Sequence, residues 1–264
     1  MAYHKVDDSF EWGITRQTAG QFENQIKYLF QNGYKSLSLE DAFLLETHFL
    51  ECKASALPLE KRVVITFDDG YESVYKFAFP ILQKYGFVAS VFIITGYVGK
   101  FNDWDVTWGK RFRHLSWEQI EELAKHGFSF GSHTVSHPDL TKLDKKSLQF
   151  ELSYSKKTLE DKIGKRVDFL SYPFGRYDFS VQRIAQETGY QRAFSIHTYP
   201  SELNPFSLER IGMYLLDSPW TLHIKLNHGK LFWIEDMKGR IINKFATGTV
   251  LAKPRHSCDK IGNF

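Results

Sequence analysis

The chain has few cysteines and little net charge. Cys52 and Cys258 are the two cysteines among 264 residues, and they stand far apart. This excludes a disulfide framework and a zinc site made of thiolates. Lys and Arg together number 34 against 31 for Asp and Glu, which leaves a net charge of +3. Without long runs of one sign, this balance gives no electrostatic footprint for nucleic acid, and no nucleic-acid partner is expected.

Long apolar runs are also missing. No stretch of about 18 apolar residues occurs, so no transmembrane segment is expected. The first thirty residues lack the basic start and the apolar stretch of a secretory signal. The sequence as it stands therefore predicts a cytoplasmic protein, or an extracellular or cell-surface protein whose leader is missing. It gives no indication of an oligomeric state.

Short apolar runs alternate with amphipathic segments along most of the chain. This alternation predicts parallel strands covered by helices. About seven such units favour a (β/α) barrel over an open doubly wound sheet, and in both architectures chemistry lies just past the carboxyl ends of the strands. The expected strands are 2–6, 36–39, 63–67, 88–94, 128–131, 167–172 and 191–196, and the expected helices are 21–32, 41–49, 72–85, 116–127, 145–163 and 180–188.

The last fifty residues are less regular. Ser218 and Pro219 are typical of a helix start, and Gly229 of a helix end. Two short apolar runs, 231–234 and 240–245, predict a hairpin. Residues 1–245 are therefore expected to form the barrel domain, and 246–264 a poorly ordered tail.

Two motifs fall at predicted strand ends. Thr66-Phe67-Asp68-Asp69-Gly70 places two adjacent carboxylates there. Such carboxylates point in different directions, so one can bind a metal while the other acts as a base. A simple turn is the alternative, because Asp-Gly is a common turn dipeptide.

The second motif, His133-Thr134-Val135-Ser136-His137, follows the strand at 128–131. Its two histidines can converge on one ion, although a lone pair at this spacing is more often a surface or capping pair. Taken with an aspartate of the first motif, they give three ligands and leave positions open. This is typical of a catalytic metal site, since structural zinc closes all four positions. The same ligand set also suits non-haem Fe(II).

A third motif, Ser171-Tyr172-Pro173-Phe174-Gly175-Arg176, comes directly after another strand. The proline and the glycine fix a tight backbone, which can direct the Phe174 N–H into the site as an oxyanion donor. A rigid turn that caps the next helix is the alternative.

TFDDG, HTVSH and YPFG in this order resemble the polysaccharide deacetylase family (the NodB homology domain, carbohydrate esterase family 4) over about residues 63–196. The resemblance implies a distorted (β/α) barrel of about seven strands that removes acetyl groups from N-acetylated sugars with a divalent metal, either Zn²⁺ or one of Co²⁺, Ni²⁺ and Fe²⁺. It makes Asp68 the general base, and it gives Phe174 the backbone amide that helps to hold the oxyanion. The implied metal ligands are Asp69, His133 and His137.

The sequence departs from the family pattern at two points. Many members carry a base-orienting arginine where this chain has Ser171, and Arg176 and Arg210 are the candidates to replace it. The late Leu-x-His of the family matches only Leu226-Asn227-His228, at a predicted helix end. The opening of the chain around His4 is similar to a permuted branch that includes poly-N-acetylglucosamine deacetylases, whose catalytic histidine comes from the first strand. We therefore expect His4 to be the acid, with His228 as the alternative.

The segment between Thr95 and Leu115 is too long for a plain connection and is rich in aromatic residues. Long loops at an active face are often binding loops, and aromatic faces suit sugar rings; packing by the loop's own aromatics is the alternative. The expected function is metal-dependent release of acetate from an amino-sugar polymer or oligomer. Hydrolysis of another amide and a catalytically silent carbohydrate-binding protein are the alternatives. The residues expected to contact the carbohydrate are Trp104, Asp105, Tyr172 and Arg176.

Overall fold

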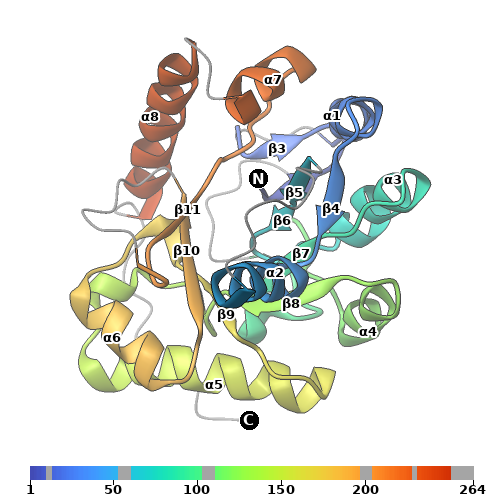
Figure 1. Cartoon of the computed structure of the whole chain (residues 1–264). Helices are drawn as coiled ribbons and strands as arrows, with labels where there is room; N and C mark the ends of the chain where they lie inside the picture. The colour runs from blue at the N-terminus through green and yellow to red at the C-terminus, as the bar shows by residue number, and fades with distance from the viewer. Residues whose placement is uncertain (10–13, 53–60, 103–110, 197–203, 228–230, 251–264) are drawn as a thin grey trace.

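Seven strands form one parallel sheet in the computed structural model, which describes residues 1–9, 14–52, 61–102, 111–196, 204–227 and 231–250 (Figure 1). The strands follow one another in space almost as they do in sequence. In spatial order they are β1 (Ala2–Tyr3), β6 (Thr66–Phe67), β7 (Ser90–Ile93), β8 (Ser129–Ser132), β9 (Phe169–Ser171), β10 (Arg192–Ile196) and β11 (Leu208–Arg210).

The two edges of this sheet meet at Ala2. Its N–H donates to the carbonyl of Ile211 at 2.8 Å, and its carbonyl accepts from the N–H of Met213 at 2.8 Å. These two bonds form a parallel bridge between Ala2 and Gly212. The sheet is therefore a nearly closed barrel, which confirms the fold expected from the alternation of strands and helices.

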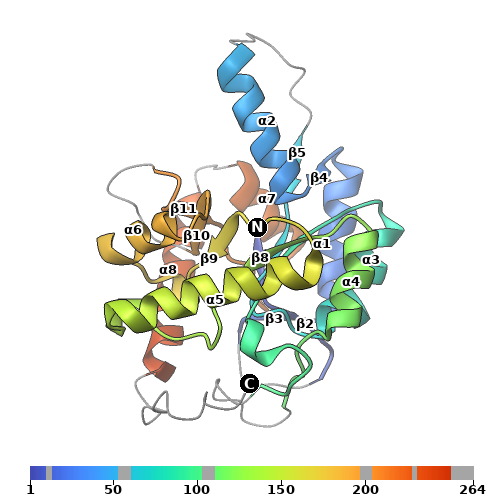
Figure 2. The same ribbon diagram turned by 90° about the horizontal axis from the view of Figure 1, so that it is seen from below.

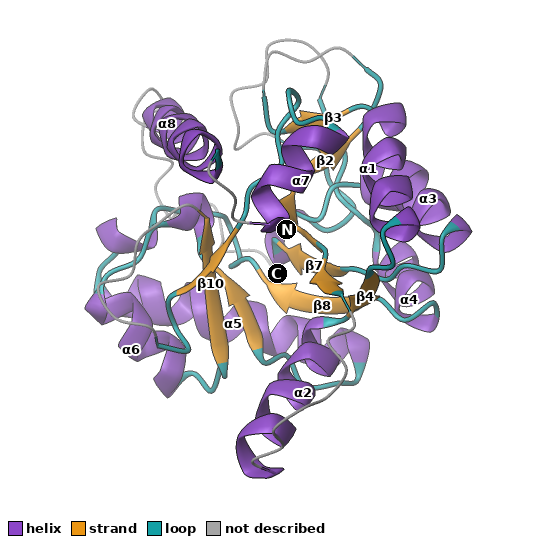
Figure 3. Ribbon diagram, turned by 45° about the horizontal axis from the view of Figure 1, so that its top comes forward, coloured by secondary structure: helices purple, strands orange, loops and turns teal. Residues whose placement is uncertain are grey.

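Most of the helices cover the outside of the barrel, whereas the helix at residues 39–52 projects from it (Figures 2 and 3). Along β7, Val91 and Ile93 belong to the large apolar cluster under these helices, whereas Phe92 belongs to a smaller one with Phe169 and Phe194. Because side chains alternate between the faces of a strand, the smaller cluster lies inside the barrel. The helices are α1 (Ala19–Gln31), α2 (Leu39–Cys52), α3 (Phe79–Lys84), α4 (Trp117–Lys125), α5 (Lys145–Ile163), α6 (Phe179–Glu187), α7 (Pro219–Asn227) and α8 (Phe232–Val250).

Local signals explain where several helices begin and end. The expected capping box of α4 is present, with Ser116 and Gln119 each accepting the other's backbone N–H. Helix α5 covers the expected residues, from the Asp144 cap to Gly164, which takes φ 70° at the end. A left-handed residue at this position favours glycine because it has no Cβ. None of the described helices has the length and hydropathy to span a membrane.

The expected first strand, the expected strand 63–67 and the expected helix 72–85 are each divided in the structure. Residues 2–6 form β1 and then β2 (Lys5–Val6), which pairs with β3 (Arg16–Gln17) in a small sheet. A second small sheet pairs β4 (Lys35–Leu37) with β5 (Arg62–Val64), so the expected strand 63–67 divides between β5 and β6.

The expected helix 72–85 has an irregular first half. It begins with a π-helical turn, η1 (Val74–Ala78), before α3 continues. Pro80 lies in the first turn of α3 and has no N–H for a bond to the preceding turn, which is the usual reason for such an interruption.

The hairpin expected at 231–245 is wrong, because these residues belong to α8. Two ion pairs at helical spacing stabilise this helix, Lys238 with Glu235 and Arg240 with Asp236. The tail expected from residue 246 also starts too early, since 246–250 continue α8. Residues 251–264 lie outside the described part of the chain.

Candidate metal centre and catalytic site

Three side chains converge at the carboxyl edge of the barrel. Asp69 follows β6, and His133 follows β8, with His137 one short loop further on. Asp69 Oδ1 lies 3.4 Å from His133 Nε2 and 3.5 Å from His137 Nε2, and all three residues are buried. The structure therefore brings together the three expected ligands, whose donor atoms all lie within 4.8 Å of one another.

The spacing of these donors suits a single ion. Ligands of a tetrahedral zinc ion with bonds of about 2.1 Å lie about 3.4 Å apart. The other ring nitrogen of His133, Nδ1, lies 2.8 Å from the carbonyl of Ser171 and donates to it. Its Nε2 is then the unprotonated atom that faces the cluster, as metal-binding histidines require. The residues present thus fit a divalent metal.

The backbone around the cluster is strained. In the described part of the chain, φ is positive at four residues other than glycine, and all four belong to the three motifs. Such conformations are uncommon and persist where the surroundings impose them, often at functional sites. The four residues are Asp69 (φ 68°), Thr134 (φ 71°), His137 (φ 59°) and Phe174 (φ 59°).

Three contacts hold this backbone in place. His114 Nδ1 lies 2.8 Å from the carbonyl of Asp69. The hydroxyl of Thr134 accepts the His137 N–H at 3.0 Å. The buried carboxylate of Glu151, in α5, accepts hydrogen bonds from two N–H groups of the same loop, those of Val135 at 2.8 Å and Ser136 at 3.0 Å. It also accepts one from the Ser136 hydroxyl. The HTVSH loop therefore depends on a side chain of α5 for its shape.

Electrostatics favour an ionised Asp69 and a neutral His137. Burial by itself raises the pKa of Asp69, but its contacts with His133 and His137 outweigh burial and hold that pKa well below its usual range. Burial, and then the charge of His133, lower the pKa of His137 to about 3. Burial also lowers the pKa of His133, but the opposing contacts with Asp69 and Asp68 raise it overall. An ionised Asp69 and a neutral His137 are the forms that bind a cation.

Asp68 is held by an arginine from the far strand of the barrel. Arg210 donates from its two terminal nitrogens to Asp68 Oδ1 and Oδ2 at 2.7 and 2.8 Å. It also donates to the hydroxyls of Ser171 at 2.7 Å and Thr66 at 2.9 Å. Arg210 rather than Arg176 therefore contacts the expected base, since Arg176 pairs with Asp139 at 3.0 Å.

The arginine also keeps Asp68 ionised. Burial raises the pKa of Asp68, but the charge of Arg210 and then that of His133 outweigh it, so that the pKa lies below its usual range. Ser171 adds a hydroxyl that donates to Asp68 Oδ2 at 3.2 Å. Strand β11 thus supplies the guanidinium that contacts Asp68, with the small Ser171 beside it.

His4 lies between β1 and β2, beside the same cluster. Its charge acts on the pKa of Asp68, Asp69 and His137. The ring is half-buried, and its Nδ1 has no hydrogen-bond partner among the described residues. His4 is therefore placed where the sequence expected an acid, whereas His228 lies outside the described residues.

Phe174 and Tyr172 differ in their positions. The Phe174 ring packs against His137 with 4.5 Å between the ring centroids, which places its backbone beside the cluster. Tyr172 is 1% exposed, and its hydroxyl donates to the carbonyl of Phe206 at 3.0 Å. Its ring stacks on Tyr177. The structure thus turns Tyr172 into the fold and away from the expected contact with substrate.

The remaining expected substrate residues are only partly described. The side chain of Arg176, the last residue of the third motif, is 39% exposed. Trp104 and Asp105 lie outside the described residues. The described ends of this loop form antiparallel bridges, Tyr71 with His114 and Phe101 with Arg113.

Two supporting residues were missed by sequence reasoning. Glu151 lies in the middle of α5, where its spacing shows nothing unusual, and His114 carries no motif of its own. His114 stacks on Tyr71, two residues after Asp69, at 4.8 Å between the centroids. The one available signal was the excess of histidine, ten in the chain, which did not single out His114.

The fold and this cluster define a class of barrel protein with an Asp-His-His site beside a buried Asp-Arg pair. A family model described as polysaccharide deacetylase matches residues 57–193, slightly more than half of the chain. The chain therefore belongs to the polysaccharide deacetylase family.

Individual relatives agree with this assignment. YxkH of Bacillus subtilis (strain 168), provisionally described as a polysaccharide deacetylase, is 35% identical over 72% of this chain and 61% of its own length. A poly-beta-1,6-N-acetyl-D-glucosamine N-deacetylase of Staphylococcus aureus (strain MRSA252) is 31% identical over 67% of this chain and 59% of its own length. The chain thus spans about three fifths of these two relatives. The resemblance to the branch containing poly-N-acetylglucosamine deacetylases is confirmed.

A solved structure also shares this fold. The deacetylase PplD of Streptococcus pyogenes, solved in complex with acetate, superimposes with a TM-score of 0.72 at 26% identity. The match covers 86% of this chain and 96% of that one. It supports the nearly closed barrel as the architecture of the matched part of the chain.

Proposed function

We propose that the chain is a metal-dependent hydrolase that removes N-acetyl groups from an amino-sugar polymer or oligomer and releases acetate. One observation carries this proposal: an ionised carboxylate, Asp68, is fixed by Arg210 directly beside the Asp69-His133-His137 cluster. A base and a metal site at adjacent residues are what hydrolysis of an unreactive amide requires.

Asp69, His133 and His137 would hold the divalent metal, and Zn²⁺ suits these ligands best, with Co²⁺, Ni²⁺ and Fe²⁺ as alternatives. When bound, such an ion polarises a carbonyl and makes water a better nucleophile. The protein's part is to hold the imidazole of His133 in one tautomer and to keep Asp69 ionised.

Asp68 takes the proton from the attacking water. Its lowered pKa keeps it ionised, and both of its oxygens are oriented by Arg210. The N–H of Phe174, in a left-handed turn beside His137, donates to the oxyanion that forms on the acetyl carbon. Asp68 does not have to reorganise during the reaction, because Arg210 and Ser171 hold it with buried hydrogen bonds.

His4 gives a proton to the departing amine, which is a poor leaving group without one. Its place at the end of β1, on the same edge as the cluster, supports this role. The products are acetate and a free amino sugar.

The names of the relatives support a carbohydrate substrate. Poly-N-acetylglucosamine is the substrate in the name of the S. aureus relative. In this chain Arg176, Trp104 and Asp105 remain the proposed contacts with the sugar. The small net charge of +3 is compatible with a neutral or mildly cationic glycan.

The test combines metal analysis and an acetate assay on one preparation. The zinc- or cobalt-loaded protein should release acetate from oligomers of N-acetylglucosamine, and Asp68→Asn should abolish the release. Asp161→Asn, on the exposed face of α5, serves as the matched control and should behave as wild type. Normal turnover in Asp68→Asn would exclude the assigned base. Sugar binding without turnover, or turnover of only an N-acetyl peptide, would contradict the proposed function.

A further inference from the structure

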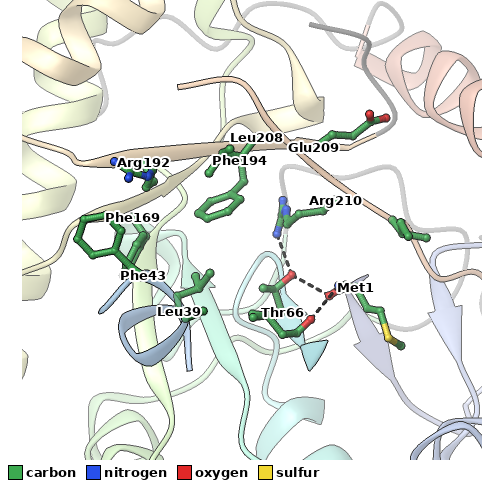
Figure 4. Close-up of a pocket in the computed structure, with 13 residues that line it drawn as sticks. Met1, Leu39, Phe43, Thr66, Phe169, Arg192, Phe194, Leu208, Glu209 and Arg210 are labelled. Atoms are coloured by element: carbon green, nitrogen blue, oxygen red, sulfur yellow. Dashed lines mark hydrogen bonds between the residues drawn. The ribbon is translucent and has the colours of Figure 1, made fainter. Parts of the chain in front are cut away.

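A cavity opens near the amino ends of the strands (Figure 4), whereas the metal cluster follows their carboxyl ends. Arg210, which binds Asp68, is one of its lining residues. The cavity has a volume of about 320 Å³. It lies between the starts of β9, β10 and β11 and the first turn of α2. Small barrels normally fill their interior with side chains. An unfilled space of this size is therefore unusual and suggests a binding site.

The walls of this cavity are mostly apolar. Phe169 and Phe194 point inward from β9 and β10, and Phe43 comes from α2. Phe43 and Phe169 meet edge to face with 6.3 Å between the ring centroids. Leu39 and Leu208 complete this wall. Such a surface suits a flat or chain-like apolar group.

Two guanidinium groups interrupt the apolar wall. Arg192 lies over the ring of Phe43, 4.4 Å from its centroid. Arg210 lies 5.0 Å from the centroid of Phe92, with its terminal nitrogens directed to Asp68. Its Nε is buried and has no hydrogen-bond partner among the described residues. The cavity therefore combines aromatic walls with positive charge.

The one acidic lining residue, Glu209, lies on the other side of β11. Leu208 and Arg210 share the inner face of this strand, so the residue between them points outward. Figure 4 shows the Glu209 carboxylate directed away from Arg192 and Phe194. It is therefore not placed to repel an anion from the inner wall.

We propose that this cavity binds a small organic anion with an apolar body, such as an aryl- or alkylcarboxylate. The carboxylate meets the guanidinium of Arg192, and the apolar body lies between Phe43, Phe169 and Phe194. Volumes of about 300 Å³ and upward, apolar walls and a few placed polar groups are typical of small-molecule sites. Charge-assisted bonds from arginine to carboxylate are the strong kind. This inference does not depend on the proposed deacetylase activity.

The test uses 4-phenylbutanoate as the probe, titrated into the metal-loaded protein and followed by NMR signals of the probe. We expect saturable binding at one site. The neutral analogue 4-phenylbutan-1-ol should bind about tenfold more weakly, because it lacks the partner for Arg192. Equal binding of the alcohol would overturn the anionic class, and an absence of saturable binding would overturn the site.

Variants locate the binding. Arg192→Gln should weaken binding of the probe about tenfold, and Leu208→Trp should abolish binding by filling the cavity. Arg183→Gln, on the exposed face of α6, is the matched control and should leave binding unchanged. Circular dichroism checks the fold of each variant. If Leu208→Trp fails to fold, Arg192→Gln and the alcohol still decide the question. Wild-type affinity in Arg192→Gln would overturn the proposal.

A carboxylate can also bind to a metal, so the titration is repeated after treatment with a chelator. None of the three cluster residues lines the proposed cavity, which needs no ion, so the affinity should be the same in both forms. Loss of binding in the metal-free protein would place the probe at the Asp69-His133-His137 cluster and overturn the proposal.

Discussion

Arg210 and Asp68 form a two-pronged ion pair across the barrel, with nitrogen–oxygen distances of 2.7 and 2.8 Å. The two residues are 142 positions apart in sequence and lie in strands, or at strand ends, that are not neighbours in the sheet. Both are buried, at 6% and 2% exposure. The pair therefore links the shape of the barrel to the charge of the expected base.

Replacing the arginine should impair both stability and catalysis. Arg210→Met leaves Asp68 buried without its partner, which should cost about 3–5 kcal/mol of unfolding free energy. The pKa of Asp68 should rise, because Arg210 is the main group that lowers it. Asp68 acts as a base only above its pKa, so the acidic limb of the pH–rate profile should move to higher pH. Urea unfolding and acetate release against pH measure the two effects.

The pH dependence of stability has a definite sign. In the wild-type protein the pKa of Asp68 is depressed on folding. Its contribution is present above the unfolded value of about 3.9 and is lost as the pH falls through the folded value. In Arg210→Met the folded pKa rises, so this contribution should shrink or reverse, and the variant should lose less stability than the wild type as the pH falls below about 4. An unchanged acid transition in the variant would contradict the role given to the pair.

Exchanging the arginine with its neighbour provides a rescue. Ser171 touches both Asp68 and Arg210, at 3.2 and 2.7 Å. The resemblance to the family predicted an arginine at the position of Ser171. The double variant Ser171→Arg with Arg210→Ser should recover part of the activity that Arg210→Ser alone loses. Activity of the double variant at or below that of the single variant would show that β11 is the only working origin for the guanidinium.

Removing a metal ligand should separate binding from folding. His133→Ala and His137→Ala should each lower zinc affinity at least a hundredfold, measured by competition with a chelating dye. His126→Ala is the control, since this histidine lies at the exposed end of α4 and pairs with Glu122. Zinc should also raise the melting temperature of the wild-type protein, because binding to the folded state alone stabilises it. Wild-type zinc affinity in both ligand variants would refute the assigned cluster.

The identity of the acid can be tested with the leaving group. His4→Ala should slow release of acetate from the N-acetyl sugar by about 10²–10⁴-fold. The same variant should hydrolyse 4-nitrophenyl acetate at close to the wild-type rate, because nitrophenolate leaves without a proton. His228→Ala should be normal with both substrates. The reverse result, with His228→Ala selective for the amide, would assign the acid to His228.

Glu151 is expected to support metal binding from outside the cluster. Glu151→Ala removes the acceptor for the N–H groups of Val135 and Ser136. It should weaken zinc binding about 10–100-fold, as the loss of other groups that orient metal ligands does. Glu151→Gln keeps one oxygen for both N–H groups and should retain affinity within a few-fold. Competition titrations of both variants measure the effect. Equal losses in the two variants would mean that the charge matters rather than the acceptor geometry.

Strand and helix positions in the barrel could be predicted because apolar patterning and caps act locally. Helix α5 begins and ends at the expected residues since Asp144 and Gly164 cap it. The error at α8 has a physical cause. Its apolar residues and its Gly239 also fit a hairpin, whereas the ion pairs Glu235–Lys238 and Asp236–Arg240, at helical spacing, favour the helix.

The metal cluster was also accessible from sequence, because its three residues come from motifs at strand ends. Its supporting groups were not. Arg210 could be named only as one of two candidates, since the choice depends on which strand closes the barrel beside β1. Glu151 reaches the HTVSH loop through the packing of α5 on β8, and no short-range pattern records that contact.

Replacing two different glycines with alanine should change the stability of the barrel in opposite directions. Gly131 lies on β8, where an added Cβ would stand 2.5 Å from the Phe92 ring and 3.0 Å from the carbonyl of Phe169. Gly131→Ala should therefore destabilise the protein by about 1–3 kcal/mol, as overpacking of a core does. Gly20, in the first turn of α1, has nothing within 4 Å of an added Cβ. Gly20→Ala should stabilise by about 0.5–1 kcal/mol, because alanine loses less backbone entropy on folding. Urea unfolding of the two variants should thus move the midpoint in opposite directions, and a stabilised Gly131→Ala would mean that β8 does not approach Phe92 this closely.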